Sequence, residues 1–250
     1  MAPLGLVGNL SHDRVGGGPP RLGGGVFYGA RALALLGLPV QVVARGETLE
    51  PFPIPATILP AHETTAFSFR YEGDRRVMEV EAVGEPWTAE DIASVEPDVE
   101  WLHVAALLRS DFPAQTMAAL AHERKVSLDG QGLARVPAVG PLRLDSDFDP
   151  AVLQAVSILK LSENEAETLG GIDALGRLGV PEVVVTRGRQ GSVVLTGGEV
   201  HELSSRPVRT ADPTGAGDAF AVGYLAARSE GRNPLDAARA AGDLVARFLS

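Results

Sequence analysis

Short apolar runs that alternate with helical patterns along the whole chain are the feature that most limits its fold. Helical periodicity occurs at residues 25–37, 112–123 and 164–170, and Asn164 is the predicted N-cap of the third helix. Strands that alternate with helices in this way are typical of a mostly parallel sheet covered by helices. The predicted strands lie at residues 4–8, 40–44, 101–107, 126–129, 157–161, 182–186, 192–196 and 200–203.

The segment at residues 57–83 departs from this alternation. Its apolar residues recur with period two around residues 72–75, which predicts a β-hairpin. Such a hairpin either extends the edge of the sheet or covers a site as a lid, and both options stay open. Together with a glycine-rich loop at residues 11–24, it forms the predicted lid insert of a single domain that spans residues 1–250.

The composition argues against several classes of partner. The formal net charge of −10 offers no basic face to nucleic acid or to anionic membranes, although a local nest of N–H groups can still bind a small anion. The sequence has no cysteine, so thiolate chemistry and thiolate metal sites are excluded. It shows no signal peptide and no apolar run near the ~20 residues that cross a bilayer, so we expect a cytoplasmic location.

The stretch ADPTGAGDAF, residues 211–220, carries the strongest chemical signal. If a helix begins at Gly215 or Ala216, the N–H groups of Ala216, Gly217 and Asp218 point out of its end. The helix dipole adds positive potential there. Glycine at positions 215 and 217 lets the backbone turn sharply and approach a ligand closely. The stretch therefore predicts an anion site that suits a phosphate.

The acidic side chain of Asp218 is unexpected beside an anion site. It makes sense if the carboxylate accepts the proton of a group that attacks the phosphate. The alternative is that Asp218 only caps the helix, and Asp212 and Thr214 can likewise be cap or turn residues. The sequence has no P-loop motif, and no GxGxxG follows a strand, which argues against a dinucleotide oxidoreductase.

The string DPTGAGDAF is similar to the C-terminal signature of the PfkB or ribokinase-like sugar kinases. This resemblance implies a ribokinase-like three-layer α/β/α sandwich, with a mostly parallel central sheet and a small β lid. It also implies that Gly215, Ala216 and Gly217 form an anion hole for the migrating phosphoryl group. Asp218 would then be the base that deprotonates the acceptor hydroxyl.

Segments near the N-terminus resemble the acceptor side of the same family. VGNLSHDRV would place Asp13 on the hydroxyls of a sugar, because a carboxylate accepts two such hydrogen bonds. GGGVFYGARALALLG resembles the helix start that places Gly24 and Gly25 against the acceptor. Tyr28 stands where the family usually has asparagine, and its flat apolar ring departs from the standard ribose or fructose pose.

Two further segments resemble a branch of the family that includes myo-inositol kinases and also tends to carry tyrosine at the position of Tyr28. They are TTAFSFRYEGDRR and VSLDGQGLAR. The resemblance assigns Asp129, Gln131 and Arg135 to the acceptor or phosphate side of the cleft. The alternative for these three residues is a turn at the end of a strand with a partly solvated arginine.

The donor side is carried by two other segments. LSENEAETLGG resembles the N-x-x-E element, which implies that Glu167 lies near a metal ion through water, although a capped surface helix explains it as well. VVVTRGRQGSVVL resembles the nucleotide strand and turn, followed by a hairpin. The residues assigned to the nucleotide are Asn164, Thr186, Gly188, Gly191, Asp212 and Thr214.

The resemblance predicts an ATP-dependent kinase that transfers the terminal phosphoryl group to a hydroxyl of a sugar or polyol of inositol, ribose or fructose type. Mg²⁺ is the expected cofactor, and a monovalent cation is a further candidate. One alternative is a nucleoside or hydroxymethylpyrimidine kinase in which Tyr28 stacks on a base. The other is a non-catalytic sugar- or nucleotide-binding regulator. An apolar lid face could close over its own site or pair two subunits, so a homodimer through the lid is a candidate assembly.

Overall fold

The computed structural model describes residues 3–72, 75–95, 97–205 and 212–250, and its larger sheet has nine strands. These strands are β1 (Leu4–Asn9), β4 (Val40–Arg45), β5 (Thr57–Leu59), β8 (Trp101–Ala105), β9 (Lys125–Asp129), β11 (Ile158–Ser162), β12 (Glu182–Thr186), β13 (Ser192–Thr196) and β14 (Glu199–Leu203). Their order is β14-β13-β12-β11-β9-β8-β1-β4-β5. Among the described strand pairs of this sheet, only β12–β13 and β13–β14 are antiparallel. All of the strands predicted from apolar runs are present.

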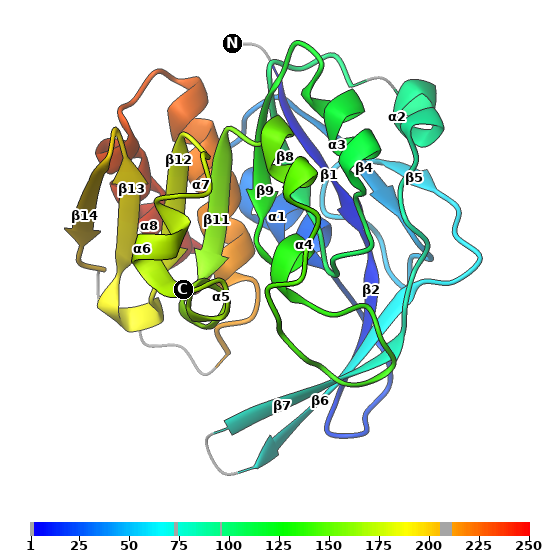
Figure 1. Cartoon of the computed structure of the whole chain (residues 1–250). Helices are drawn as coiled ribbons and strands as arrows, with labels where there is room; N and C mark the ends of the chain where they lie inside the picture. The colour runs from blue at the N-terminus through cyan, green and yellow to red at the C-terminus, as the bar shows by residue number, and fades with distance from the viewer. Residues whose placement is uncertain (1–2, 73–74, 96, 206–211) are drawn as a thin grey trace.

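Helices cover both faces of this sheet, which gives three layers (Figure 1). The helices on one face are α1 (Gly25–Ala34), α7 (Ala216–Ser229) and α8 (Pro234–Phe248). The helices on the other face are α2 (Ala89–Val95), α3 (Ala114–Ala121), α4 (Gln131–Ala134), α5 (Glu163–Thr168) and α6 (Gly171–Leu175). Two short 3-10 helices lie in connections, η1 (Pro150–Ala155) and η2 (Gly188–Gln190). Among the described residues, no helix has the length and apolarity needed to span a membrane.

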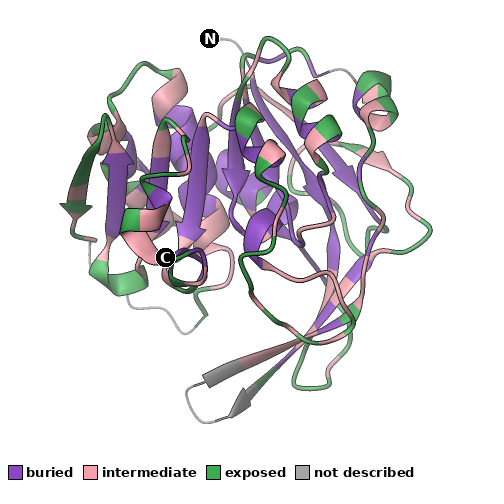
Figure 2. Ribbon diagram, in the orientation of Figure 1, coloured by how far each residue is buried: buried purple, intermediate pink, exposed green. Residues whose placement is uncertain are grey.

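Each face of the sheet has its own hydrophobic core. Leu6, Val26 and Tyr224 belong to the core beneath α1, α7 and α8, whereas Leu128 and Met117 belong to the core on the opposite face. The central strands are buried almost throughout, while the edge strand β14 is largely exposed (Figure 2). Burial on both faces explains why these strands are continuous apolar runs in the sequence. The predicted α/β/α architecture with a mostly parallel sheet is confirmed.

A second, five-stranded sheet stands beside the larger one, and we call it the lid sheet. Its strands, in the order β10-β7-β6-β2-β3, are β10 (Gly140–Pro141), β7 (Arg75–Ala82), β6 (Thr65–Glu72), β2 (Ser11–Val15) and β3 (Arg21–Gly23). The antiparallel β6–β7 pair confirms the predicted hairpin, which projects away from the larger sheet in Figure 1. Residues 73–74 of its predicted turn lie outside the described residues.

The lid sheet differs from the predicted lid insert in two respects. Residues 11–24 are not simply a loop, because β2 pairs in parallel with β6 and antiparallel with β3, which leaves only the residues between β2 and β3 as the turn. Residues 57–59 belong to the larger sheet, since β5 pairs with β4. Whether the lid sheet opens and closes over a site stays a prediction.

The two faces of the lid sheet differ in polarity. One face packs apolar side chains against the larger body, and this cluster comprises Phe67, Phe69, Val80, Leu107 and Leu108. The opposite face carries charged pairs, including Arg14–Glu81 and Arg70–Glu79. The apolar face of the lid therefore packs on its own chain, and a homodimer through the lid stays a prediction.

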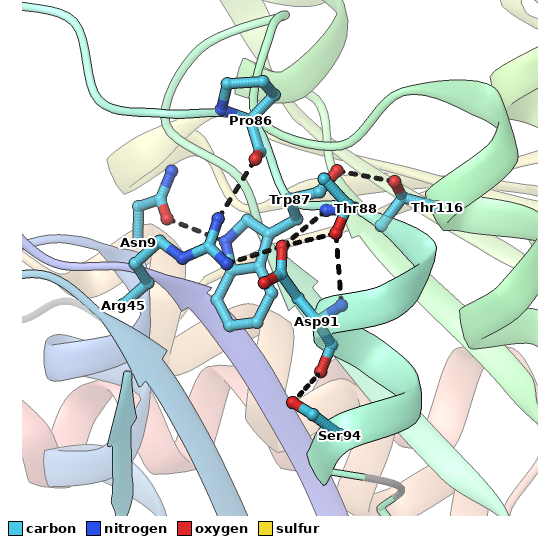
Figure 3. A network of polar contacts seen from close by, with 8 residues as sticks. All are labelled: Asn9, Arg45, Pro86, Trp87, Thr88, Asp91, Ser94 and Thr116. Atoms are coloured by element: carbon cyan, nitrogen blue, oxygen red, sulfur yellow. Dashed lines mark hydrogen bonds and ion pairs between the residues drawn. The ribbon is translucent and has the colours of Figure 1, made fainter. Parts of the chain in front are cut away.

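A network around Arg45, at the end of β4, anchors the segment that leads from the lid sheet to α2 (Figure 3). Its guanidinium donates to the carbonyl oxygen of Pro86 at 3.0 Å and pairs with Asp91 at 2.6 Å. It also lies 4.6 Å from the centre of the Trp87 ring, and Trp87 Nε1 donates to Asn9 Oδ1 at 2.7 Å. The base of the lid is thus held at the carboxyl ends of β1 and β4.

Candidate active site

Helix α7 begins at Ala216, as the glycine-rich turn predicts. Gly215 is the N-cap with φ of 82°, and a Cβ there would lie 2.7 Å from the ring of Tyr28, so only glycine fits. No side chain caps this helix end, which argues against the capping alternative for Asp218. The N–H of Ala216 donates to Pro213, whereas those of Gly217 and Asp218 have no main-chain acceptor among the described residues. These two groups are available to an anion.

The turn at residues 23–25 separates two carboxyl groups. A Cβ at Gly25 would lie 2.9 Å from Asp218 Oδ1, and one at Gly23 would overlap with the carboxyl group of Asp13. Ser11 Oγ donates to Asp13 Oδ1 at 2.7 Å and orients it. Gly24, with φ of 97°, is the N-cap of α1 and a position where a side chain would meet the backbone of Asn9. The lid residue Asp13 and the helix residue Asp218 therefore flank the start of α1.

Tyr28 lies in the first turns of α1 and faces the same acidic groups. Burial raises the pKa of its hydroxyl to about 12, and the charges of Asp13, Asp218 and Asp212 act in the same direction. The phenol is therefore neutral near pH 7 and can donate a hydrogen bond within this acidic site. Tyr28 thus stands between the lid carboxyl and the N-terminus of α7.

A buried ion pair lies beneath the first turn of α7. Lys160 on β11 and Asp129 at the end of β9 are register partners, and Lys160 Nζ donates to Asp129 Oδ2 at 3.2 Å. Their side chains are 6% and 2% exposed. Asp129 Oδ1 also accepts from the main-chain N–H of Gln131, which begins α4. Sequence reasoning missed Lys160, because a lysine inside an apolar run has no local signature.

The charges around Asp218 make it an unusual carboxyl group. Burial raises its pKa to about 7, and the negative charge of Asp129 acts in the same direction. The positive charges of Lys160 and Arg135 oppose this rise, whereas Glu165 adds to it. Asp218 is therefore partly protonated at neutral pH, which is the range in which a general base operates well.

The start of α5 differs from the prediction. Ser162 is the N-cap, and Glu165 completes a capping box, with its carboxylate accepting from Ser162 N at 2.8 Å. The prediction of Asn164 as the cap is wrong, because S-x-x-E at residues 162–165 satisfies both ends of the box. Asn164 and Glu167 are exposed, whereas Glu165 is buried. The negative charge of Glu165 acts on both Lys160 and Asp218. The geometry favours Glu165 over Glu167 as the acid nearest the site.

The predicted nucleotide turn follows β12. Thr186 Oγ1 donates to the carbonyl oxygen of Leu161, so this hydroxyl ties β12 to β11. Gly188 and Gly191 have φ of 53° and 104°, and a Cβ at Gly191 would overlap with the main chain of Leu203. The hairpin predicted after this turn is formed by β13 and β14. These residues shape the turn, and their contact with a nucleotide stays a prediction.

The residues just before α7 form a compact turn. Asp212 Oδ1 accepts from Thr214 N at 2.9 Å and from Thr214 Oγ1 at 2.6 Å. This pattern is an Asx turn, and it supports the turn interpretation of both residues. In the described part of the chain, no group of three or more carboxylate or imidazole side chains gathers as a metal site.

The layered sheet, the lid sheet and the glycine-rich N-terminus of α7 beside an acidic residue define the ribokinase class of fold. A structure described as a pyrophosphate-dependent kinase in the ribokinase family, complexed with a pyrophosphate analog and myo-inositol, superimposes with a TM-score of 0.84 at 24% identity. The alignment covers 98% of this chain and 94% of that one.

A family model described as pfkB family carbohydrate kinase matches residues 60–247. The chain therefore belongs to the pfkB family of carbohydrate kinases, phosphotransferases with an alcohol group as acceptor. It is 31% identical to a fructokinase of Salmonella thompson over 168 residues, which covers 58% of this chain and 74% of that relative. It is 36% identical to an inositol 3-kinase of Zea mays over 120 residues, covering 46% and 31%. The matched part spans about half the length of other fructokinases.

Proposed function

We propose that this kinase transfers the terminal phosphoryl group of Mg-ATP to a hydroxyl of a small polyol of the inositol type. The observation that carries the proposal is the convergence of Asp13, Tyr28 and Asp218 at the N-terminus of α7. Two carboxyl groups and a phenol offer several hydrogen bonds to a molecule rich in hydroxyls. The free N–H groups of Gly217 and Asp218 suit the phosphoryl group that such a molecule attacks.

The residues of the chain account for the chemical step. Asp13 and Tyr28 orient the acceptor, and one acceptor hydroxyl gives its proton to the carboxylate of Asp218. Its oxygen forms a new bond to phosphorus as the bond from phosphorus to the bridging oxygen of the donor breaks, and ADP leaves. The N–H groups of Gly217 and Asp218 hold the charge on the migrating group. Positioning and these fixed dipoles supply most of the acceleration.

The site fits a phosphate group and leaves a limited role for metal ligation by protein. Gly215 needs its positive φ, and a Cβ at Gly217 would lie 2.9 Å from Lys160 Nζ, so the backbone forms an open cradle. When bound, Mg²⁺ would neutralise charge on the phosphate oxygens. Contact of the exposed Glu167 with that ion through water, and binding of a monovalent cation, stay predictions.

Two observations support a polyol of the inositol type as the acceptor. The inositol 3-kinase of Zea mays is among the relatives of this chain, with 36% identity over 120 residues. The branch of the family that includes myo-inositol kinases tends to carry tyrosine at the position of Tyr28. In this chain, Tyr28 lies near Asp13 and Asp218. A flat ring flanked by carboxyl groups suits a cyclic polyol, which has an apolar C–H face and polar edges.

Pyrophosphate is a second candidate donor. The structural neighbour with a TM-score of 0.84 is described as pyrophosphate-dependent. The anion site at α7 requires only the phosphate portion of a donor. With pyrophosphate, the same transfer releases inorganic phosphate instead of ADP.

The test is a steady-state assay that crosses two donors with four acceptors. Mg-ATP and Mg-pyrophosphate are each supplied with myo-inositol, fructose, ribose and cytidine, and the phosphorylated product is measured. We expect the highest kcat/KM with myo-inositol. Preference for cytidine would instead support a nucleoside kinase, and binding of sugars without product from any pair would support a non-catalytic regulator.

A further inference from the structure

Lys160 is a buried charged group to which the reaction described above assigns no role. A Cβ placed on Gly217 would lie 2.9 Å from Lys160 Nζ, so the ammonium group sits directly under the second residue of α7. The neighbouring strand supplies its partner, Asp129, at 3.2 Å. The sheet, not the helix, therefore delivers a positive charge to the anion site.

We propose that Lys160, held by Asp129, is a positioning residue that keeps the carboxyl group of Asp218 charged and adds positive potential behind the anion hole. The proposal rests on the proposed function, in which Asp218 accepts the proton of the acceptor. Lys160 acts through Asp218 and through the backbone of Gly217.

The groups that face Asp218 come from five elements and decide the direction of each effect. Lys160 on β11 and Arg135 after α4 favour its charged form, whereas Asp129 on β9 and Glu165 on α5 disfavour it. Tyr28 on α1 is neutral near pH 7, because its pKa is raised to about 12. The buried His103 on β8, which faces Lys160 and Asp129, is also neutral, since burial lowers its pKa to about 4.

Removal of Lys160 and removal of Asp129 therefore have opposite electrostatic consequences. Without the ammonium group, the carboxyl of Asp218 loses the positive charge that lowers its pKa most, so its pKa rises. Without the carboxylate of Asp129, it loses its strongest like-charged neighbour and its pKa falls. A pair that only stabilised the fold would not separate the two substitutions in this way, because either one breaks it.

The test is the pH dependence of kcat for Lys160→Met and Asp129→Asn. In Lys160→Met, we expect the pH of half-maximal kcat to rise by about one unit or more, with a loss of about tenfold at pH 7 and little change in acceptor KM. In Asp129→Asn, we expect that pH to fall. Lys125→Met is the matched control, since Lys125 and Lys160 are the only lysines and Lys125 is exposed on Trp101.

A second measurement needs no substrate and so separates this proposal from the proposed function. Melting temperatures are recorded from pH 5 to pH 9 for each background with and without Asp218→Asn, and the difference reports the pKa of Asp218 in the folded protein. If no donor and acceptor react, the proposed function fails, yet these curves still decide the role of Lys160. Lys160→Arg is included because it keeps the charge, and we expect it to restore most of the shift.

The proposal is supported if the pKa of Asp218 moves up in Lys160→Met and down in Asp129→Asn. It is overturned if the two substitutions move it in the same direction, or if neither moves it. It is also overturned if Lys160→Arg shifts the pKa as far as Lys160→Met does. Should Lys160→Met fail to fold, the proposal is supported if the pKa of Asp218 falls in Asp129→Asn and stays near the wild-type value in Lys160→Arg, and it is overturned by any other result.

Discussion

A carboxyl group and a cation lie near each end of helix α7, but their arrangement differs between the two ends. At the C-terminal end, Glu182 on β12 accepts from Arg228 through Nε and Nη2 and from the hydroxyl of Tyr224, at 2.6 to 3.1 Å. Both donors lie on α7, and the arginine also complements the helix dipole there. At the N-terminal end, no hydrogen bond to the carboxyl of Asp218 is found among the described residues, and Lys160, the cation with the largest effect on its pKa, is bonded to Asp129.

This difference separates stability from chemistry along one helix. The C-terminal pair is satisfied, which fixes α7 on the sheet. The N-terminal carboxyl group is partly buried beside another acid, and its pKa is raised to about 7, so holding it in the folded protein costs stability. Groups kept in such an unfavourable state mark functional sites more often than structural ones.

The largest expected effect is on the N-terminal end. We expect Asp218→Asn to lower kcat by about 10²–10⁴-fold, because the amide cannot accept the proton of the acceptor hydroxyl. Acceptor and donor binding should persist, since the shape of the side chain and the N–H groups of α7 are kept. Steady-state kinetics, with binding of myo-inositol and ATP measured by calorimetry, checks both parts. Turnover close to that of the wild type would rule out Asp218 as the base.

A smaller effect of a different kind is expected at the C-terminal end. Glu182→Ala leaves the guanidinium of Arg228 and the hydroxyl of Tyr224 without their acceptor, so we expect a loss of about 3 kcal/mol of stability. The kcat of the folded enzyme should change little, because this pair lies at the far end of α7. Urea unfolding and kinetics at a temperature below the transition measure the two quantities.

The control for this substitution is a surface pair near the same end of the helix. Glu230 pairs with Arg232 at 2.8 Å, and the arginine side chain is 49% exposed. We expect Glu230→Ala to change stability by less than about 1 kcal/mol. A loss in Glu182→Ala no larger than in this control would contradict the structural role of the partly buried pair.

Much of the larger sheet could be predicted, because strands buried on both faces are continuous apolar runs. Strand β2 could not, since Ser11–Val15 is polar and its pairing with β6 joins segments far apart in the sequence. The start of α5 contains two overlapping capping patterns, and only the Ser162–Glu165 box is formed.

The candidate site divides in the same way. The turn at Gly215 and the position of Asp218 follow from local rules for helix starts. Lys160 and Asp129 are 31 residues apart, and no local pattern reveals that β9 and β11 place them opposite one another. Sequence reasoning therefore located the helix start at Gly215 and Asp218, but it missed Lys160, the buried charge beneath that start.

The smallest expected effect concerns the cost of the raised pKa itself. Asp218 has an ordinary pKa of 3.8 in the unfolded chain and about 7 in the folded one, so between these values the folded protein binds a proton that the unfolded chain has released. Its stability therefore falls as the pH rises through this range. Asp218→Asn removes that loss, so the variant should melt above the wild type at pH 8. The advantage should disappear toward pH 4, where Asp218 is protonated in the folded protein. Thermal melts from pH 4 to pH 8 check the sign of this difference in melting temperature. An equal gain at pH 4 and pH 8 would show that folding does not raise the pKa of Asp218.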